Sequence, residues 1–205
     1  MYKLLIGITL LFSSVIANAA TVDIVDAEYQ GYNYNTNVDY FSPVGQSFTA
    51  GANQLDFINL LLLDMGPGTE NLQSNVIVRD GDINGAIIGQ SQTVVLEDCF
   101  NFTEAPGCGI SGGTATAVRF DFSSLSLFSG NLYTFEIIDL GTGLGFGYDL
   151  NGGYEEGTAY FNGAASTSDL WFSAGHISAV PVPAALWLFI SGLLGLTGFR
   201  LSTRT

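Results

Sequence analysis

The chain has 205 residues, which leaves room for one domain of ordinary size once its two apolar ends are set aside. All 19 acidic residues lie between Asp23 and Asp169, where only Arg79 and Arg119 are basic, so this stretch carries a formal charge of −17. Such a surface repels phosphate backbones and excludes nucleic acid as a partner, whereas it suits solubility outside the cell and attracts cations.

Residues 1–19 have the pattern of a removable export signal. Lys3 supplies a short positive region, residues 4–16 form an apolar core, and Ala17 and Ala19 provide the small-x-small cleavage site. We expect signal peptidase to cleave after Ala19. The alternative, a buried N-terminal helix, does not explain why the positive and small residues occupy these positions.

The body of the chain has the pattern of short strands separated by turns. In residues 118–122 and 133–137, apolar and polar side chains alternate, which places one face of a strand on a core and the other in water. Turn-forming pairs such as Asp80-Gly81 and Asn84-Gly85 stand between the runs. The predicted strands are 46–49, 57–63, 75–79, 93–97, 115–122, 133–139, 159–163 and 170–174.

This pattern predicts an all-β fold, an antiparallel β-sandwich of jelly-roll type, flanked by a signal helix and one transmembrane helix. The expected divisions are 1–19 for the signal peptide, 20–177 for an extracellular sandwich and 178–205 for a sorting tail. Fifteen Phe and nine Tyr supply enough packing volume for a full core.

The two cysteines, Cys99 and Cys108, are the only ones in the chain. In an exported protein, a close pair of this kind favours a disulfide over a metal or redox site. His176 is the single histidine, so a zinc site lacks ligands, and we expect this residue to lie in the linker before the tail.

Beyond residue 177 the composition changes abruptly. No charged residue occurs until Arg200, and the sixteen residues from Ala184 to Phe199 form an apolar run about 24 Å long as a helix. Counted from Val180, the run reaches about 30 Å, the thickness of a bilayer core. Arg200 and Arg204 place the far end in the cytoplasm and the acidic body outside.

The motif at the start of this tail is Val180-Pro181-Val182-Pro183-Ala184, and Arg200 and Arg204 follow its apolar run. The tail resembles a PEP-CTERM sorting signal of the Val-Pro-x-Pro-Ala variety, with Val182 where the commonest form has Glu. The resemblance implies processing by an exosortase, a membrane-embedded cysteine enzyme of Gram-negative bacteria that make exopolysaccharide. It implies an intermediate anchored in the inner membrane, then a place on the cell surface or in the extracellular matrix.

The body shows a second, broader resemblance. Gly45-Gln46-Ser47-Phe48-Thr49-Ala50, Phe120-Asp121-Phe122-Ser123, Leu132-Tyr133-Thr134-Phe135 and Ser168-Asp169-Leu170-Trp171-Phe172 look like the jelly-roll modules found upstream of bacterial surface anchors. These modules share no activity that could be carried over.

Asp80, Asp82 and Asn84 stand at alternate positions before Gly85, as in the first half of a calcium-binding loop. The twelfth position is Ser91, where an EF-hand has Glu. Two interpretations stay open: an ordinary hairpin turn, or a calcium site. No other cofactor is expected.

The residues predict a non-enzymatic surface or biofilm-matrix component, and two alternatives stay open. Tyr29, Tyr32, Tyr34 and Tyr40 lie among Asn and Gln residues, so they either stack on sugar rings, as in a carbohydrate-binding adhesin, or pack at a sheet edge. A secreted hydrolase is the weaker alternative, since the chain has a single histidine, His176, to serve a catalytic triad.

Overall fold

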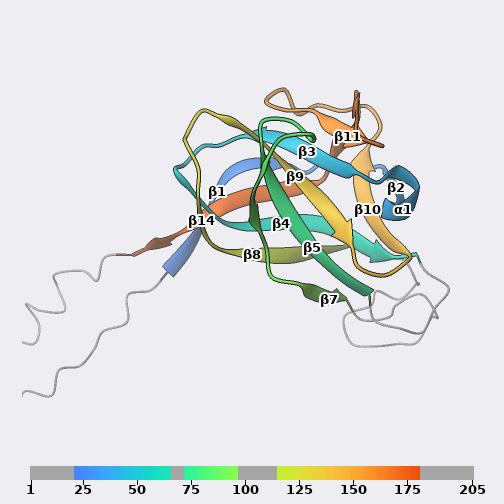
Figure 1. Cartoon of the computed structure of the whole chain (residues 1–205), viewed down its shortest axis with the longest axis horizontal. Helices are drawn as coiled ribbons and strands as arrows, with labels where there is room; N and C mark the ends of the chain where they lie inside the picture. The colour runs from blue at the N-terminus through green and yellow to red at the C-terminus, as the bar shows by residue number, and fades with distance from the viewer. Residues whose placement is uncertain (1–20, 66–71, 97–114, 181–205) are drawn as a thin grey trace, which may run out of the picture. The chain divides into compact units, whose positions relative to one another are not determined.

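Almost every segment that the computed structural model describes is a β-strand. The described residues are 21–65, 72–96 and 115–180. Within them, α1 (Val38–Phe41) is the one helix, a single turn capped by the side chain of Asn37, which accepts a hydrogen bond from the Asp39 N–H. The strands form two antiparallel sheets (Figure 1), so the predicted all-β fold with two sheets is confirmed.

Sheet A is organised around the long strand β4, which pairs with β8 along one edge and with β14 and β10 along the other. β10 in turn pairs with β2 and β13. The strands of sheet A are β1 (Thr21–Tyr29), β2 (Tyr34–Asn37), β4 (Gln54–Asp64), β8 (Thr116–Ser126), β10 (Leu144–Asp149), β13 (Asp169–Leu170) and β14 (Phe172–Ala179).

Sheet B is organised around β9, which lies between β3 and β5. β11 and β12 extend this sheet beyond β3, and β6 and β7 pair with β5. The strands of sheet B are β3 (Val44–Thr49), β5 (Leu72–Asp80), β6 (Ile87–Gln90), β7 (Val94–Leu96), β9 (Leu132–Asp139), β11 (Ala159–Phe161) and β12 (Ala164–Ser166).

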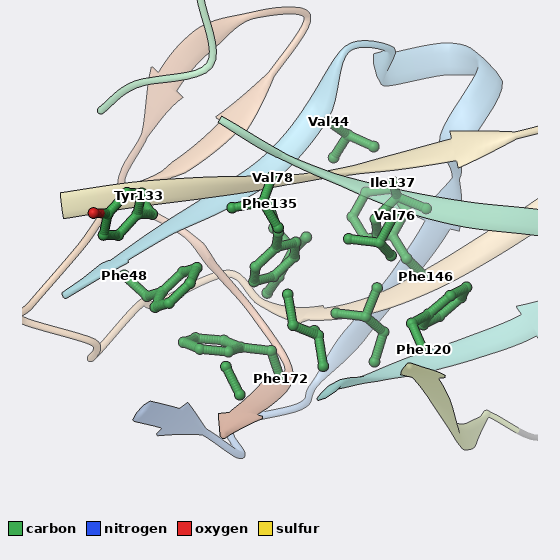
Figure 2. Packing of buried hydrophobic residues seen from close by; sticks show 14 of the residues in the cluster. Val44, Phe48, Val76, Val78, Phe120, Tyr133, Phe135, Ile137, Phe146 and Phe172 are labelled. Atoms are coloured by element: carbon green, nitrogen blue, oxygen red, sulfur yellow. The ribbon is translucent and has the colours of Figure 1, made fainter. Parts of the chain in front are cut away.

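The core fills the space between the two sheets with side chains at every second position of each strand. Figure 2 shows Phe48, Phe135 and Phe172 pointing toward one another, from β3, β9 and β14. The rings of Phe135 and Phe172 have centroids 5.3 Å apart, and Phe48 lies 6.4 Å from each of them. This aromatic group joins sheet A to sheet B.

Every predicted strand overlaps an observed one, and two of them needed correction. The run predicted at 159–163 ends at Phe161, because Asn162 and Gly163 adopt φ of 53° and 72° and turn the chain into β12. The run predicted at 170–174 is divided at Trp171 into β13 and β14, and β14 continues to Ala179. The sequence analysis missed β1, β2, β6, β10 and β12.

Truncation of Phe172 tests the aromatic core. We expect Phe172→Ala to lower the free energy of unfolding by about 3–5 kcal/mol, because it leaves a cavity beside Phe48 and Phe135. Phe128→Ala is the matched control, since Phe128 is 73% exposed and its loss should change stability by at most about 0.5 kcal/mol. Urea unfolding measures both variants, and equal effects of the two would contradict this assignment of the core.

Candidate functional site

Several residues singled out from the sequence lie outside the described part of the chain. Val180, the first residue of the sorting motif, is described and is 41% exposed. The others are the disulfide pair Cys99 and Cys108, the cleavage residues Ala17 and Ala19, and the sorting residues Pro181, Val182, Pro183, Ala184, Arg200 and Arg204. Within residues 21–65, 72–96 and 115–180, no helix is long and apolar enough to cross a membrane.

The calcium-loop motif forms the turn that joins β5 to β6. The carboxylate of Asp82 accepts a hydrogen bond from the Asn84 N–H at 2.8 Å, and Gly81 adopts a φ of 75°. A Cβ at Gly85 would lie 1.8 Å from the Asp80 carbonyl oxygen, so glycine is needed where the turn closes. In the described residues, no three His, Cys, Asp or Glu side chains group as metal ligands. Calcium binding at Asp80, Asp82 and Asn84 therefore stays a prediction.

His176 lies in β14 and not in a linker, which corrects the expectation from the sequence. Its Nδ1 atom is 2.6 Å from a carboxylate oxygen of Asp26 on β1. The next residue, Ile177, donates its backbone N–H to Asp56 at 2.7 Å. The last sheet strand extends this far because it pairs with β1 in addition to β4.

A buried carboxylate joins the two sheets where β13 begins. Asp169 is 5% exposed and accepts hydrogen bonds from Gln46 Nε2 at 3.0 Å and from the backbone N–H groups of Gly153 and Tyr154 at 2.8 and 2.9 Å. The carbonyl oxygen of the Gln46 side chain accepts the N–H of Leu170 at 3.1 Å. These bonds offset the cost of burying the carboxylate and fix β13 against β3.

A second polar group surrounds Asp149 at the end of β10. Tyr29 donates its hydroxyl to the Asp149 carboxylate at 2.9 Å, and Asn33 Nδ2 donates to the other oxygen at 2.6 Å. Hydrogen bonds from the Asn151 N–H and the Tyr29 hydroxyl hold the pKa of Asp149 below its usual range. Burial, with the hydrogen bond to Asp149 adding to it, raises the pKa of Tyr29 to about 12.

The outer face of sheet A carries an aromatic and amide group over β10. Phe146 and Tyr148 are buried in the core, so Gly145 and Gly147 face outward. A Cβ at Gly147 would lie 2.9 Å from the ring of Tyr32 and 2.7 Å from Leu61, which shows that both side chains cover this glycine. Trp171 donates its backbone N–H to the Gly147 carbonyl, so it is the neighbour of Gly147 in the sheet.

The structure separates the four tyrosines that the sequence analysis grouped. Tyr29 belongs to the Asp149 network, and Tyr34 packs edge-on against Tyr148 with centroids 5.8 Å apart. Tyr40 lies on α1 and is 76% exposed. Tyr32 alone of the four covers Gly147. Sequence reasoning missed Trp171 as its neighbour, although Gly145 and Gly147 alternating with Leu144, Phe146 and Tyr148 was a usable signal.

Comparison with known proteins does not assign the chain to a family. No protein-family model matches the chain, and no curated protein shows significant similarity to it.

Calcium binding at the β5–β6 turn is tested by calorimetric titration. If the site exists, the chain should release or absorb heat with Ca²⁺ and gain thermal stability, because oxygen ligands at alternate positions suit this cation. Asp82→Ala should abolish both effects, whereas Asp121→Ala, on β8, should leave them unchanged. Absence of heat and of a thermal shift in the unmodified chain would rule the site out.

The raised pKa of Tyr29 predicts a loss of stability at alkaline pH. In the unfolded chain a tyrosine loses its proton near pH 10, whereas Tyr29 in the fold does so near 12. The stabilisation from Tyr29 is therefore complete below pH 10 and declines as the pH rises from 10 to 12. We expect the stability difference between the unmodified protein and Tyr29→Phe to be constant from pH 7 to 9 and to shrink by pH 12. Urea midpoints across this range measure it, and a constant difference would contradict the assignment.

Proposed function

We propose that the chain is an exported, surface-sorted and non-enzymatic β-sandwich of jelly-roll type, which serves as a cell-surface or exopolysaccharide-matrix component. The observation that carries the proposal is the order of features after β14: a Pro-x-Pro motif from Val180, an uncharged apolar run, and Arg200 and Arg204. Signal peptidase and an exosortase-type enzyme are its processing partners. The apolar run anchors the chain in the membrane during export.

The position of the motif along the chain supports this proposal. β14 ends at Ala179, its last four residues alternate between half-buried and exposed, and Val180 is 41% exposed. A processing enzyme that recognises Val180 and the prolines after it needs an extended segment outside a folded sheet. Val180, where the motif begins, is the first residue after β14 and is not part of a strand.

The order of strands supports the jelly-roll assignment. From β2 to β5, successive strands alternate between sheet A and sheet B, and the same alternation recurs from β8 to β11. Crossing between sheets at nearly every connection is typical of jelly rolls, in which two sheets exchange strands at both ends. Figure 1 shows β3, β9 and β5 side by side, with β4, β8 and β14 in the other sheet.

The intact mass of the protein from an exosortase-carrying Gram-negative host tests the proposal. We expect the mature chain to begin at Ala20 and to lack the residues after the Pro-x-Pro motif. Replacing Pro181 and Pro183 with Ala should leave the tail attached, because the extended recognition segment loses its fixed backbone angles. Val182→Glu, which restores the commonest form of the motif, is the matched control and should still be processed.

An intact tail on the unmodified protein would contradict sorting by cleavage and would leave a single-pass membrane anchor. A tail that is lost equally in the host without its exosortase would contradict the proposed enzyme.

A further inference from the structure

The outer face of sheet A presents one row of neighbouring side-chain positions across three strands. Asn35 pairs with Gly147 across β2 and β10, and Trp171 lies on the other side of Gly147, bonded through its N–H at 3.1 Å. Leu170 and Phe172 are 1% and 0% exposed, so they point into the core and the Trp171 side chain between them lies on the outer face. Adjacent strands are about 4.8 Å apart, so Asn35, Gly147 and Trp171 lie within the width of two sugar rings.

The ring of Tyr32 is held against this row. Its Cδ2 and Cε2 atoms come within 3.0 Å of the position that a Cβ on Gly147 would occupy, so only glycine lets the ring lie this close to the sheet. Asn35 Nδ2 donates a hydrogen bond to the Tyr32 hydroxyl at 3.2 Å, which ties down the far end of the ring. Tyr32 is nevertheless 44% exposed. The ring is therefore held by the sheet and is still accessible to a ligand, which a stacking residue requires.

The amide group of Asn59 lies on the same face near Trp171, next to Ser173, which is 6% exposed and holds the amide in place. Asn59 on β4 donates from Nδ2 to Ser173 Oγ on β14 at 2.9 Å, and the two residues are paired in the sheet register. Within the described residues this is the one hydrogen bond that the Asn59 side chain makes, so its carbonyl oxygen and second amide hydrogen remain available. Uncharged donors and acceptors beside aromatic rings suit the hydroxyl groups and the apolar faces of pyranose sugars.

The charges on the body restrict the ligand to neutral molecules. Arg119 is the basic residue on this face, and it bonds Asp121 at 2.6 Å and Asp23 at 2.5 Å while its guanidinium lies over the Phe57 ring. Arg79, on sheet B, pairs with Glu136 at 2.7 Å. Both basic side chains of the described residues are therefore occupied, and the formal charge of −17 between Asp23 and Asp169 repels polyanions.

We infer that the outer face of sheet A around Gly147 binds neutral hexopyranose polysaccharides, with Tyr32 and Trp171 stacking on sugar rings and Asn59 bonding their hydroxyl groups. This inference does not depend on processing of the tail, because every residue in it lies in the folded body.

The test uses the full chain, solubilised in a detergent without sugar groups, in affinity electrophoresis. The gels contain a neutral polymer, either hydroxyethyl cellulose, a soluble β-1,3-glucan or a galactomannan, or the polyanion alginate. We expect at least one neutral polymer to retard the protein and alginate to have no effect. Tyr32→Ala and Trp171→Ala should each weaken the retardation about tenfold or more through lost stacking.

Matched variants separate binding from folding. Tyr32→Phe and Trp171→Phe keep a ring at each position and should retain binding within about threefold of the unmodified chain. Tyr40→Ala removes a tyrosine that is 76% exposed on α1 and is not one of the residues of the proposed face, and it should bind normally. Each variant is used only after its thermal unfolding midpoint is measured, and tryptophan fluorescence, which needs no Ala variant, provides the test where an Ala variant does not fold.

Tryptophan fluorescence supplies a second readout. The chain has two tryptophans, Trp171 and Trp187. Oligosaccharides of the retarding polymer should change the emission of the unmodified chain and leave the emission of Trp171→Phe unchanged, because Trp171 is the tryptophan that the proposal places against the sugar. The inference is overturned if no neutral polymer retards the chain, if alginate retards it equally, or if folded Tyr32→Ala and Trp171→Ala bind like the unmodified protein.

Discussion

The buried hydrogen bonds of Asp169 are the interaction on which the arrangement of this protein most depends. Asp169 belongs to sheet A, whereas its partner Gln46 belongs to sheet B, and the other two donors come from the loop at Gly153 and Tyr154. A carboxylate that is 5% exposed is stable only while such donors replace its water. These hydrogen bonds therefore fix the position of β13 against β3. They also determine which way the residues that follow β13 point.

The aromatic core and the outer face are two consequences of that position. Once Leu170 is bonded to Gln46, alternation directs Phe172 into the core against Phe135 and leaves Trp171 on the other side. The division of the strand at Trp171 also lets the segment move from the edge of β10 to the edge of β4. Trp171 thus lies where β10, β4 and the β13–β14 segment of sheet A approach one another.

The residues of β10 likewise alternate between the core and the outer face of the sheet. Leu144, Phe146 and Tyr148 fill the core, whereas Gly145 and Gly147 leave the outer face without side chains of its own. Met65 and Leu63 cover the first glycine, and Tyr32 and Leu61 cover the second. The outer surface of this strand is therefore built by neighbouring segments, which explains how a loop residue such as Tyr32 reaches the middle of a sheet face.

Much of the sandwich could be predicted because its central strands alternate strongly. Residues 118–122 of β8 and 133–137 of β9 alternate between apolar and polar side chains, and both strands were predicted, although β8 continues four residues beyond the predicted end at Phe122. β10 was missed because glycine has low strand propensity, and its outward positions have no polar side chain to reveal the alternation. β1 was missed because Val22, Ile24 and Val25 are exposed apolar residues that occupy both faces of the strand, which hides the difference between its faces.

The candidate face could not be found from sequence spacing, for a physical reason. Asn35, Gly147 and Trp171 are far apart in the chain and become neighbours only through the pairing of β2, β10 and the β13–β14 segment. A tyrosine cluster near the start of the chain suggested sugar stacking, but the fold assigns Tyr29 and Tyr34 to other contacts. The local composition suggested that aromatic residues stack on sugar rings. The sheet register decides which aromatic residues are placed to do so.

The register of β14 also connects the face to the proposed sorting of the tail. β14 pairs with β4 from Phe172 to Gly175, opposite Leu60 to Phe57, so the residues that hold Trp171 and Ser173 in place precede the motif at Val180. Cleavage after that motif would remove none of these contacts. A stacking face fixed upstream of the cleavage point is therefore the same before and after processing, so a protein delivered with this tail would need no refolding to bind its ligand at the surface.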